Sequence, residues 1–321
     1  MNPESDKRDL LSIADLSTDL SEVIERAREM KRARVDGNLS ATLQGTNIAL
    51  IFEKPSTRTR TSFEVAINDL GAHAISLAAK EMQLGRGETI ADTARVLSRY
   101  VDAIVYRAYR HIDMVELARF ASVPVVNALD DREHPCQIVG DLVTLAERWK
   151  GVFRGRRLAY VGDGNNVLNS LLIGGAMVGL DVACAIPEAY RPPADVVQKA
   201  EEIARRTGSR LTFSTDPKAA ARGADALYTD VWVSMGDEGE KEAREKAFQG
   251  YQINDALVAL ASPDVWVLHD LPAHRGMEIT DSVMDGPRAA IWDQAENRLH
   301  AQKAILERLL RPPPAGRPPM N

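Results

Sequence analysis

The chain is poor in cysteine, in aromatic residues and in long apolar runs, and these shortages exclude several classes of protein. Its two cysteines, Cys136 and Cys184, are too few and too far apart for a disulfide framework, which fits a reducing compartment. No apolar run approaches the roughly 20 residues of a membrane span, and residues 1–8 are too polar for a signal peptide. We therefore expect a cytoplasmic protein with no membrane partner.

The chain also has no excess of positive charge. The chain has 40 Lys and Arg against 46 Asp and Glu, a formal net charge of −6, and it has no basic stripe with interleaved aromatic residues. Such a surface does not suit a nucleic acid, whose phosphates are bound by clustered Lys and Arg. Any site for an anion must therefore be built from a few local cationic side chains.

Short apolar runs alternate with amphipathic segments along the 321 residues, which is the pattern of parallel sheets covered by helices. The length suits two domains of ordinary size. A helical pattern ends and a strand pattern begins within RWKGVFRG at 148–155, so we place the boundary there. The prediction is an α/β protein of two doubly wound domains, 1–148 and 149–292, followed by a closing helix and a proline-rich tail at 311–321 to which we assign no function.

The individual elements follow from the spacing of the apolar residues. Strands are predicted at 47–52, 103–106, 123–127, 157–162, 181–186, 226–229 and 265–269. Helices are predicted at 20–34, 62–70, 90–100, 137–149, 166–178, 194–207 and 296–310. The charged run at 237–246 is expected to be a mobile loop.

The most informative segment is FEKPSTRTR at 52–60, where a predicted strand runs into a predicted helix. Ser56 stands at the helix N-terminus, where unpaired amides and the positive end of the helix dipole suit a phosphate. Arg58 and Arg60 add permanently charged, fork-shaped donors. The alternative is an ordinary N-cap serine followed by surface arginines that pair with neighbouring glutamates.

Four further motifs occur along the chain in a fixed order, together with the segment DTARVL at 92–97. They are MQLGRGE at 82–88, HPCQ at 134–137, DVWVSMG at 230–236 and HDLP at 269–272. With STRTR at 56–60, this set resembles the aspartate and ornithine carbamoyltransferases in order and spacing, over roughly residues 8–310. The ornithine-type branch is the more similar, because it shares the pattern of Asp230, Ser234, Met235 and Gly236.

The resemblance implies roles for the first half of the chain. Residues expected to bind carbamoyl phosphate are Ser56, Thr57, Arg58, Thr59, Gln83, Arg107, His134, Gln137, Leu271 and Arg298. Among them, His134 would donate to the carbamoyl oxygen as it becomes an oxyanion, and Gln137 would orient the carbamoyl nitrogen. Gln83 would reach into a neighbouring subunit, which implies a homotrimer. The last helix, within 293–310, would cross back onto the first domain and complete it.

The second half is expected to hold the amino acid. The turn GDGNN at 162–166 invites a dinucleotide-binding interpretation, but the third glycine of that fingerprint is Val167 and no ribose-binding acid follows the next strand. We expect the glycines to bring the backbone and Asn166 close to a small substrate. By resemblance, Asn166, Asp230, Ser234 and Met235 contact the α-amino-acid end of ornithine.

Asp270 departs from the family pattern, because ornithine-type enzymes usually carry cysteine there. A carboxylate beside an alkylammonium favours its charged form, which opposes attack by the amine unless Asp270 accepts the proton. Asp270 is therefore either a base or a filter for the acceptor amine. By resemblance, the Leu271–Pro272 peptide is expected to be cis, with the Leu271 carbonyl directed toward that amine.

These observations predict an enzyme that transfers the carbamoyl group of carbamoyl phosphate to the side-chain amine of ornithine. Arg107, His134, Asp230 and Asp270 are its candidate catalytic residues. No cofactor is expected, and none of the six histidines shows zinc-ligand spacing, so no metal is expected. The alternatives are a carbamoyltransferase for a different amine or diamino acid, and a non-catalytic relative that only binds an amino acid.

Overall fold

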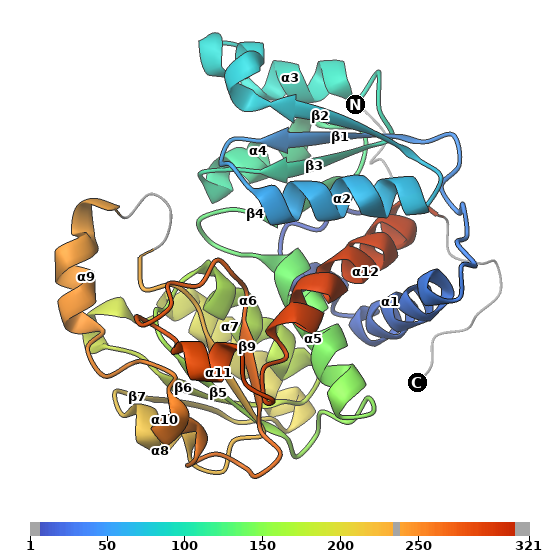
Figure 1. Ribbon diagram of the computed structural model, residues 1–321. Coiled ribbons are helices and arrows are strands. Elements are labelled where there is room, and N and C mark those ends of the chain that lie inside the picture. The colour runs from blue at the N-terminus through green and yellow to red at the C-terminus, as the bar shows by residue number, and fades with distance from the viewer. Residues whose placement is uncertain (1–6, 234–237, 312–321) are drawn as a thin grey trace.

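The computed structural model describes residues 7–233 and 238–311, which form two parallel sheets connected and covered by helices (Figure 1). The first sheet has four strands in the order β2-β1-β3-β4, and the second has five in the order β7-β6-β5-β8-β9. All strand pairs within these sheets are parallel. This confirms the predicted α/β class with two doubly wound layers.

The first sheet contains β1 (Asn47–Phe52), β2 (His73–Ala78), β3 (Ala103–Arg107) and β4 (Val125–Leu129). In register, Phe52 at the end of β1 lies opposite Arg107 at the end of β3. The order in which successive strands are added reverses between these two neighbours, because β1 leads to β2 on one side while β3 leads to β4 on the other. Such a switch point opens a crevice at the carboxyl ends of the strands, where α/β proteins bind ligands.

The second sheet contains β5 (Arg157–Val161), β6 (Asp181–Ala185), β7 (Leu211–Ser214), β8 (Ala226–Thr229) and β9 (Trp266–His269). Its switch point lies between β5 and β8. The segments that follow these two strands are the 162–166 turn and the segment that begins at Asp230. The two switch points therefore bring together the motifs singled out in the sequence.

The helices of the first half are α1 (Leu20–Val35), α2 (Thr57–Asp69), α3 (Ile90–Leu97), α4 (His111–Phe120) and α5 (Pro135–Arg148). Those of the second half are α6 (Asn166–Met177), α7 (Ala194–Thr207), α8 (Pro217–Ala221), α9 (Lys241–Ala247), α10 (Asp255–Val258), α11 (Asp281–Met284) and α12 (Ile291–Leu310). Single 3-10 turns occur at Ile13–Leu16, Ala79–Glu81, Gln83–Arg86, Glu188–Tyr190 and Glu238–Glu240. No helix among the described residues is long and apolar enough to cross a membrane.

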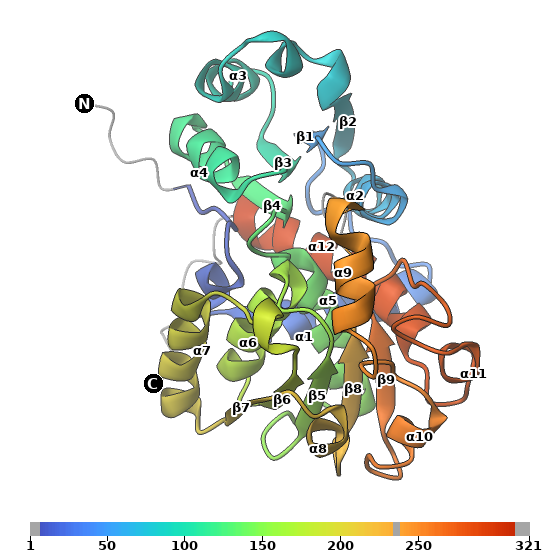
Figure 2. The ribbon, with the colours of Figure 1, turned by 90° about the vertical axis from the view of Figure 1, so that its left-hand side faces the viewer.

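The last helix, α12, packs against α1, α2 and α5, so it returns to the first half as the resemblance implied (Figures 1 and 2). A continuous cluster of buried apolar side chains passes through α1, α5, α6 and α12 and reaches both sheets. The two halves therefore share a core around α5 and α12. This shared core fixes the position of the side chains that these helices direct to the junction.

The structure corrects several predicted elements. Strands β2 and β7 were not predicted, because both are edge strands whose side chains are largely half-exposed and whose apolar runs are correspondingly short. Strand β4 lies two residues later than predicted, and α12 begins at Ile291. The run at 237–246 is not simply a loop in its described part, because Lys241–Ala247 forms α9.

Candidate active site

The segment STRTR at 56–60 begins α2, so the predicted strand-to-helix transition is present. Ser56 is the N-cap, and its hydroxyl accepts a hydrogen bond from the backbone N–H of Thr59 at 3.3 Å. Thr57 and Arg58 are exposed at this helix start. Arg60 instead pairs with Glu64 at 3.0 Å one turn along the same helix. The surface-pair alternative therefore holds for Arg60, and we do not count Arg60 among the residues of a possible anion site.

Two buried arginines lie behind this helix start. Arg107 follows Tyr106 at the end of β3, and Arg298 projects from α12 and donates to the hydroxyl of Thr59. Burial lowers the pKa of Arg107 to about 10, with further contributions from the charges of Arg298 and Arg58. Burial and the charge of Arg58 likewise lower the pKa of Arg298. The guanidinium groups of Arg58, Arg107 and Arg298 thus converge on the start of α2, and together with Ser56–Thr59 we call them the cationic cradle. A doubly ionised ligand bound there would offset the repulsion between the three guanidinium groups.

A glycine on α5 permits this convergence. A Cβ atom on Gly140 would lie 3.2 Å from both the Cα and the backbone nitrogen of Arg298. That separation is tighter than ordinary contact, so a larger residue would push α12 away from α5. Gly140 therefore sets how deeply the guanidinium of Arg298 reaches toward Thr59.

The predicted carbamoyl-binding pair lies at the start of α5. His134 is the N-cap residue, and its backbone N–H donates to the hydroxyl of Ser170 at 2.9 Å. Burial, and then the charges of Arg298 and Arg107, hold the pKa of His134 well below its usual value, so the ring is neutral at pH 7. Gln137 is buried one turn later, and its Nε2 donates to Asp141 at 2.8 Å. Within the described chain, Nδ1 of His134 and Oε1 of Gln137 find no hydrogen-bond partner.

The predicted amino-acid side is built on the ends of β5 and β8. Asp230 is buried directly after β8, and its Oδ2 accepts a hydrogen bond from Nδ2 of Asn165 at 2.6 Å. Asn166, the residue named from the sequence, donates instead to the backbone carbonyl of Asp130 at 2.6 Å. Ser234 and Met235 lie outside the described residues.

The glycine-rich turn has a different structural reason from the one expected. A Cβ atom on Gly164 would overlap the backbone from the Tyr190 carbonyl to Pro192. The glycine is therefore needed for the turn to pack against the segment that follows β6. Asn165 then caps α6, with its side chain accepting from the amides of Val167 and Leu168.

Asp270 lies beside Asp230 at the end of β9. Burial, and then the neighbouring carboxylate of Asp230, raise the pKa of Asp270 well above its usual value. This shift favours the protonated form of Asp270 beside the carboxylate of Asp230. The Leu271–Pro272 peptide is cis, as the sequence comparison implied.

His269 anchors this turn and is not a free metal ligand. Asp230, His269 and Asp270 have potential ligand atoms within 4.8 Å of one another. However, Nδ1 of His269 accepts the backbone N–H of Leu271 at 2.9 Å, and Nε2 lies 3.1 Å from Glu278. Both ring nitrogens are thus engaged in holding the turn. The arrangement fits a hydrogen-bonded carboxyl pair on a fixed loop better than a cation site.

Comparison with known proteins identifies the family to which the chain belongs. Residues 8–147 match the family model "Aspartate/ornithine carbamoyltransferase, carbamoyl-P binding domain", and residues 154–309 match the Asp/Orn binding domain of the same family. The chain belongs to the aspartate/ornithine carbamoyltransferase family.

Relatives and solved structures agree with this assignment. An ornithine carbamoyltransferase from Methanoculleus marisnigri is 54% identical over 95% of this chain and 97% of its own length. A catabolic ornithine carbamoyltransferase from Thermoplasma acidophilum is also 54% identical, over 95% and 99%. The structure of the ornithine carbamoyltransferase from Pyrococcus furiosus superposes with a TM-score of 0.90 at 51% identity, covering 94% of this chain and 96% of that one.

Three polar residues of the junction were missed in the sequence. Asn165 contacts Asp230, while Asp141 and Gln294 lie behind Gln137 and His269. Gln137 and Asp141 are spaced i, i+4 on a helix, and that spacing places two side chains on one face. This signal could have found Asp141, whereas Gln294 meets it only through the packing of α12 on α5.

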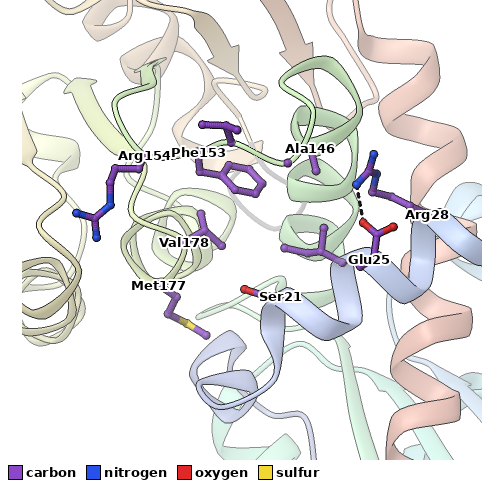
Figure 3. A pocket seen from close by; sticks show the side chains of 11 residues that line it. Ser21, Glu25, Arg28, Ala146, Phe153, Arg154, Met177 and Val178 are labelled. Atoms are coloured by element: carbon purple, nitrogen blue, oxygen red, sulfur yellow. Dashed lines mark hydrogen bonds and ion pairs between the residues drawn. The ribbon is translucent and has the colours of Figure 1, made fainter. Parts of the chain in front are cut away.

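A separate hollow of about 460 Å³ does not belong to the family's site (Figure 3). It lies between α1, the end of α5, the 151–154 link and the end of α6. Its lining is about equally polar and apolar, with Phe153 and Val178 facing the ion pair of Glu25 and Arg28 across the opening. The cradle and carboxyl residues described above are not among the residues that line it.

Proposed function

We propose that this chain is an ornithine carbamoyltransferase, which converts carbamoyl phosphate and L-ornithine to L-citrulline and phosphate. The observation that carries the proposal is the convergence of Arg58, Arg107 and Arg298 at the start of α2, beside buried carbamoyl-facing groups. The family membership and the names of relatives about 50% identical over nearly the full length support the same reaction.

The first half, 1–148 completed by 293–310, holds carbamoyl phosphate. The start of α2, from Ser56 to Thr59, binds the phosphate through backbone amides and hydroxyls, with the guanidinium groups of Arg58, Arg107 and Arg298 around it. His134 and Arg107, with Thr59, stabilise the oxyanion that forms on the carbamoyl oxygen. Because the pKa of His134 is depressed, its neutral ring can donate only one hydrogen bond.

The second half, 149–292, holds the amino acid. Asp230 accepts the α-ammonium, and Asn166, Ser234 and Met235 contact the same end. Asn165 orients the Asp230 carboxylate. The raised pKa of Asp270 favours its neutral form in this position. A neutral Asp270 places no full negative charge beside the side-chain amine, which removes the objection that the sequence raised against a carboxyl group at this position.

The transfer step needs positioning and electrostatics and no nucleophilic side chain. The uncharged amine attacks the carbamoyl carbon and forms the N–C bond, with the Leu271 carbonyl directed toward it. The C–O bond to phosphate then breaks, and its electron pair leaves with the phosphate into the cationic cradle. The attacking nitrogen loses one proton, and the departing phosphate accepts it.

A homotrimer with shared sites through Gln83 is part of this proposal. Gln83 is exposed in the short turn that follows the edge strand β2. Val96 on α3, Tyr100 in the turn after α3 and Ile112 on α4 are exposed at 45%, 70% and 63%, which is apolar surface that a neighbouring copy would cover. Sedimentation or light scattering of the purified protein measures the subunit number directly.

The deciding experiment is citrulline formation from carbamoyl phosphate with ornithine and with a panel of other diamino acids and diamines. Arg58→Ala is expected to lower kcat/KM by about 100-fold or more, as for loss of one charge-stabilising donor. Arg60→Ala is the matched control and should stay near wild type, because Arg60 pairs with Glu64. If no amine gives a product while carbamoyl phosphate still binds, the chain is a non-catalytic relative that only binds its ligands. If another amine is preferred, the reaction stays the same but ornithine is not the acceptor.

A further inference from the structure

Asp141 is a buried carboxyl group for which the transfer reaction as described has no role. It lies on α5 with 0% of its surface exposed, one helical turn after Gln137. Three donors meet it. Nε2 of Gln137 and Nε2 of Gln294 both reach Oδ1 at 2.8 Å, and the Tyr228 hydroxyl reaches Oδ2 at 2.8 Å.

The chemistry of an ionised carboxylate determines how Gln137 is oriented. Burial raises the pKa of Asp141 to about 6, so at pH 8 the group is ionised and can only accept hydrogen bonds. The atom of Gln137 that faces it must therefore be the amide nitrogen. Its carbonyl oxygen then points away, where it is buried and has no partner within the described part of the chain.

A buried acceptor without a donor is rare in folded proteins and calls for an explanation. The carbamoyl group of the substrate carries an NH2, which is the donor that Oε1 of Gln137 lacks. Were the amide turned over, Gln137 would present its own N–H groups to that NH2, and donor would face donor. The orientation of one amide therefore decides whether the carbamoyl group is held or repelled.

The same carboxylate orients a second amide on the acceptor side. Because Nε2 of Gln294 donates to Asp141, its Oε1 is free to accept the backbone N–H of His269 at 2.9 Å. His269 directly precedes Asp270 and Leu271. Charged groups that face Asp141 from neighbouring elements are Arg298 on α12 and Asp270 after β9.

We propose that Asp141 is a positioning residue for carbamoyl transfer, which sets the amide of Gln137 for the carbamoyl nitrogen and links it through Gln294 to the turn that carries Asp270. This inference rests on the proposed function and deepens it. Asp141 touches neither substrate, and acts on both through the two glutamine amides.

The test is Asp141→Asn, which keeps the shape but adds an amide that can face either way. At pH 8, we expect citrulline kcat/KM to fall roughly 10- to 100-fold, the range expected for a misplaced catalytic contact. Inhibition by inorganic phosphate, which binds the cradle, should not weaken, because the hydrogen bonds of Asp141 within the described chain go to no cradle residue and loss of its negative charge near Arg298 favours an anion. A general structural defect would weaken both together.

Two further variants make the test specific. Asp19→Asn is the matched control, because Asp19 is also a buried carboxyl group with a raised pKa, but it bonds Arg308 at the opposite end of α12. It should keep wild-type kinetics. Gln294→Met serves if Asp141→Asn does not fold, and it should raise KM for ornithine while leaving phosphate inhibition unchanged.

A double-mutant cycle checks the route through Gln137. In a Gln137→Ala background, Asp141→Asn should have a much smaller effect than in wild type, because the amide it orients is absent. Fully additive losses, an unchanged kcat/KM in Asp141→Asn, or parallel weakening of phosphate binding would each overturn the inference. Failure of the wild-type protein to make citrulline would instead overturn the proposed function itself.

Discussion

The proposed carbamoyl-phosphate side of the site is made of cations around a helix start, whereas the proposed acceptor side is made of carboxyl groups at the ends of strands β8 and β9. On the first side, Ser56 to Thr59 are consecutive and share one helix N-terminus. On the second, Asp230 and Asp270 are 40 residues apart and meet because β8 and β9 are parallel neighbours in one sheet.

The two sides also handle their charge differently. The guanidinium groups of the cradle stay charged despite burial, since an arginine with a pKa near 10 remains protonated at pH 7. On the carboxyl side, burial and the neighbouring Asp230 raise the pKa of Asp270, which favours its neutral form. The comparison teaches that a site for a dianion can tolerate repulsion between its own cationic groups, because the bound ligand offsets it. A site for a reactive amine must limit its negative charge, because negative charge favours the protonated, unreactive form of the amine.

The largest expected effect is on the cationic side. Arg107→Met should lower kcat/KM for carbamoyl phosphate by about 1,000-fold, because it removes a buried donor at the place where negative charge develops. Calorimetry should show little heat on adding carbamoyl phosphate to this variant. Undiminished binding heat together with normal turnover would contradict the assignment of Arg107 to the carbamoyl-phosphate site.

The carboxylate that joins the two sides should affect stability through its protonation. The pKa of Asp141 is raised in the folded protein to about 6, so its stabilising effect is present below about pH 4 and is lost as pH rises through 6. The free energy of unfolding of wild type relative to Asp141→Asn should fall by about 3 kcal/mol over that window. Urea denaturation at several pH values measures it, and parallel curves for the two proteins would refute it.

A smaller effect, confined to the acceptor, is expected for Asp230→Asn. Loss of the carboxylate that faces the α-ammonium should raise KM for ornithine by about 100-fold, as for loss of a buried charged hydrogen-bond partner. The dissociation constant of carbamoyl phosphate should not change. If the binding of ornithine and of carbamoyl phosphate weakens by the same factor, the two sides of the site do not act independently, and the comparison fails.

The smallest effect is expected at the position where this chain departs from its family. Asp270→Cys should improve ornithine turnover by no more than roughly 10-fold if Asp270 is a remnant of altered acceptor specificity, a change of about 1.4 kcal/mol in the barrier. Turnover is measured against the same amine panel as the wild type. A collapse of activity with every acceptor would show instead that the carboxyl group takes part in the reaction.

The sequence was most informative where neighbouring residues share one element. The start of α2, the pair His134 and Gln137 at the start of α5, and the parallel α/β architecture all followed from local patterns, the first two helped by family resemblance. Edge strands β2 and β7 were missed because partial exposure weakens their apolar pattern. Asn165 was missed because nothing in the turn tells which of two adjacent asparagines faces Asp230.

By itself, the sequence determined that this protein has two parallel α/β layers and a helix start suited to phosphate, because apolar periodicity and N-terminal amides are local properties of the chain. Only the tertiary structure decided the raised pKa of Asp270 and the orientation of the Gln137 amide. Both depend on residues from distant segments, Asp230 in one case and Asp141 within the shared core in the other. Burial and the proximity of other charged groups result from tertiary packing, so they cannot be read from any single segment of the sequence.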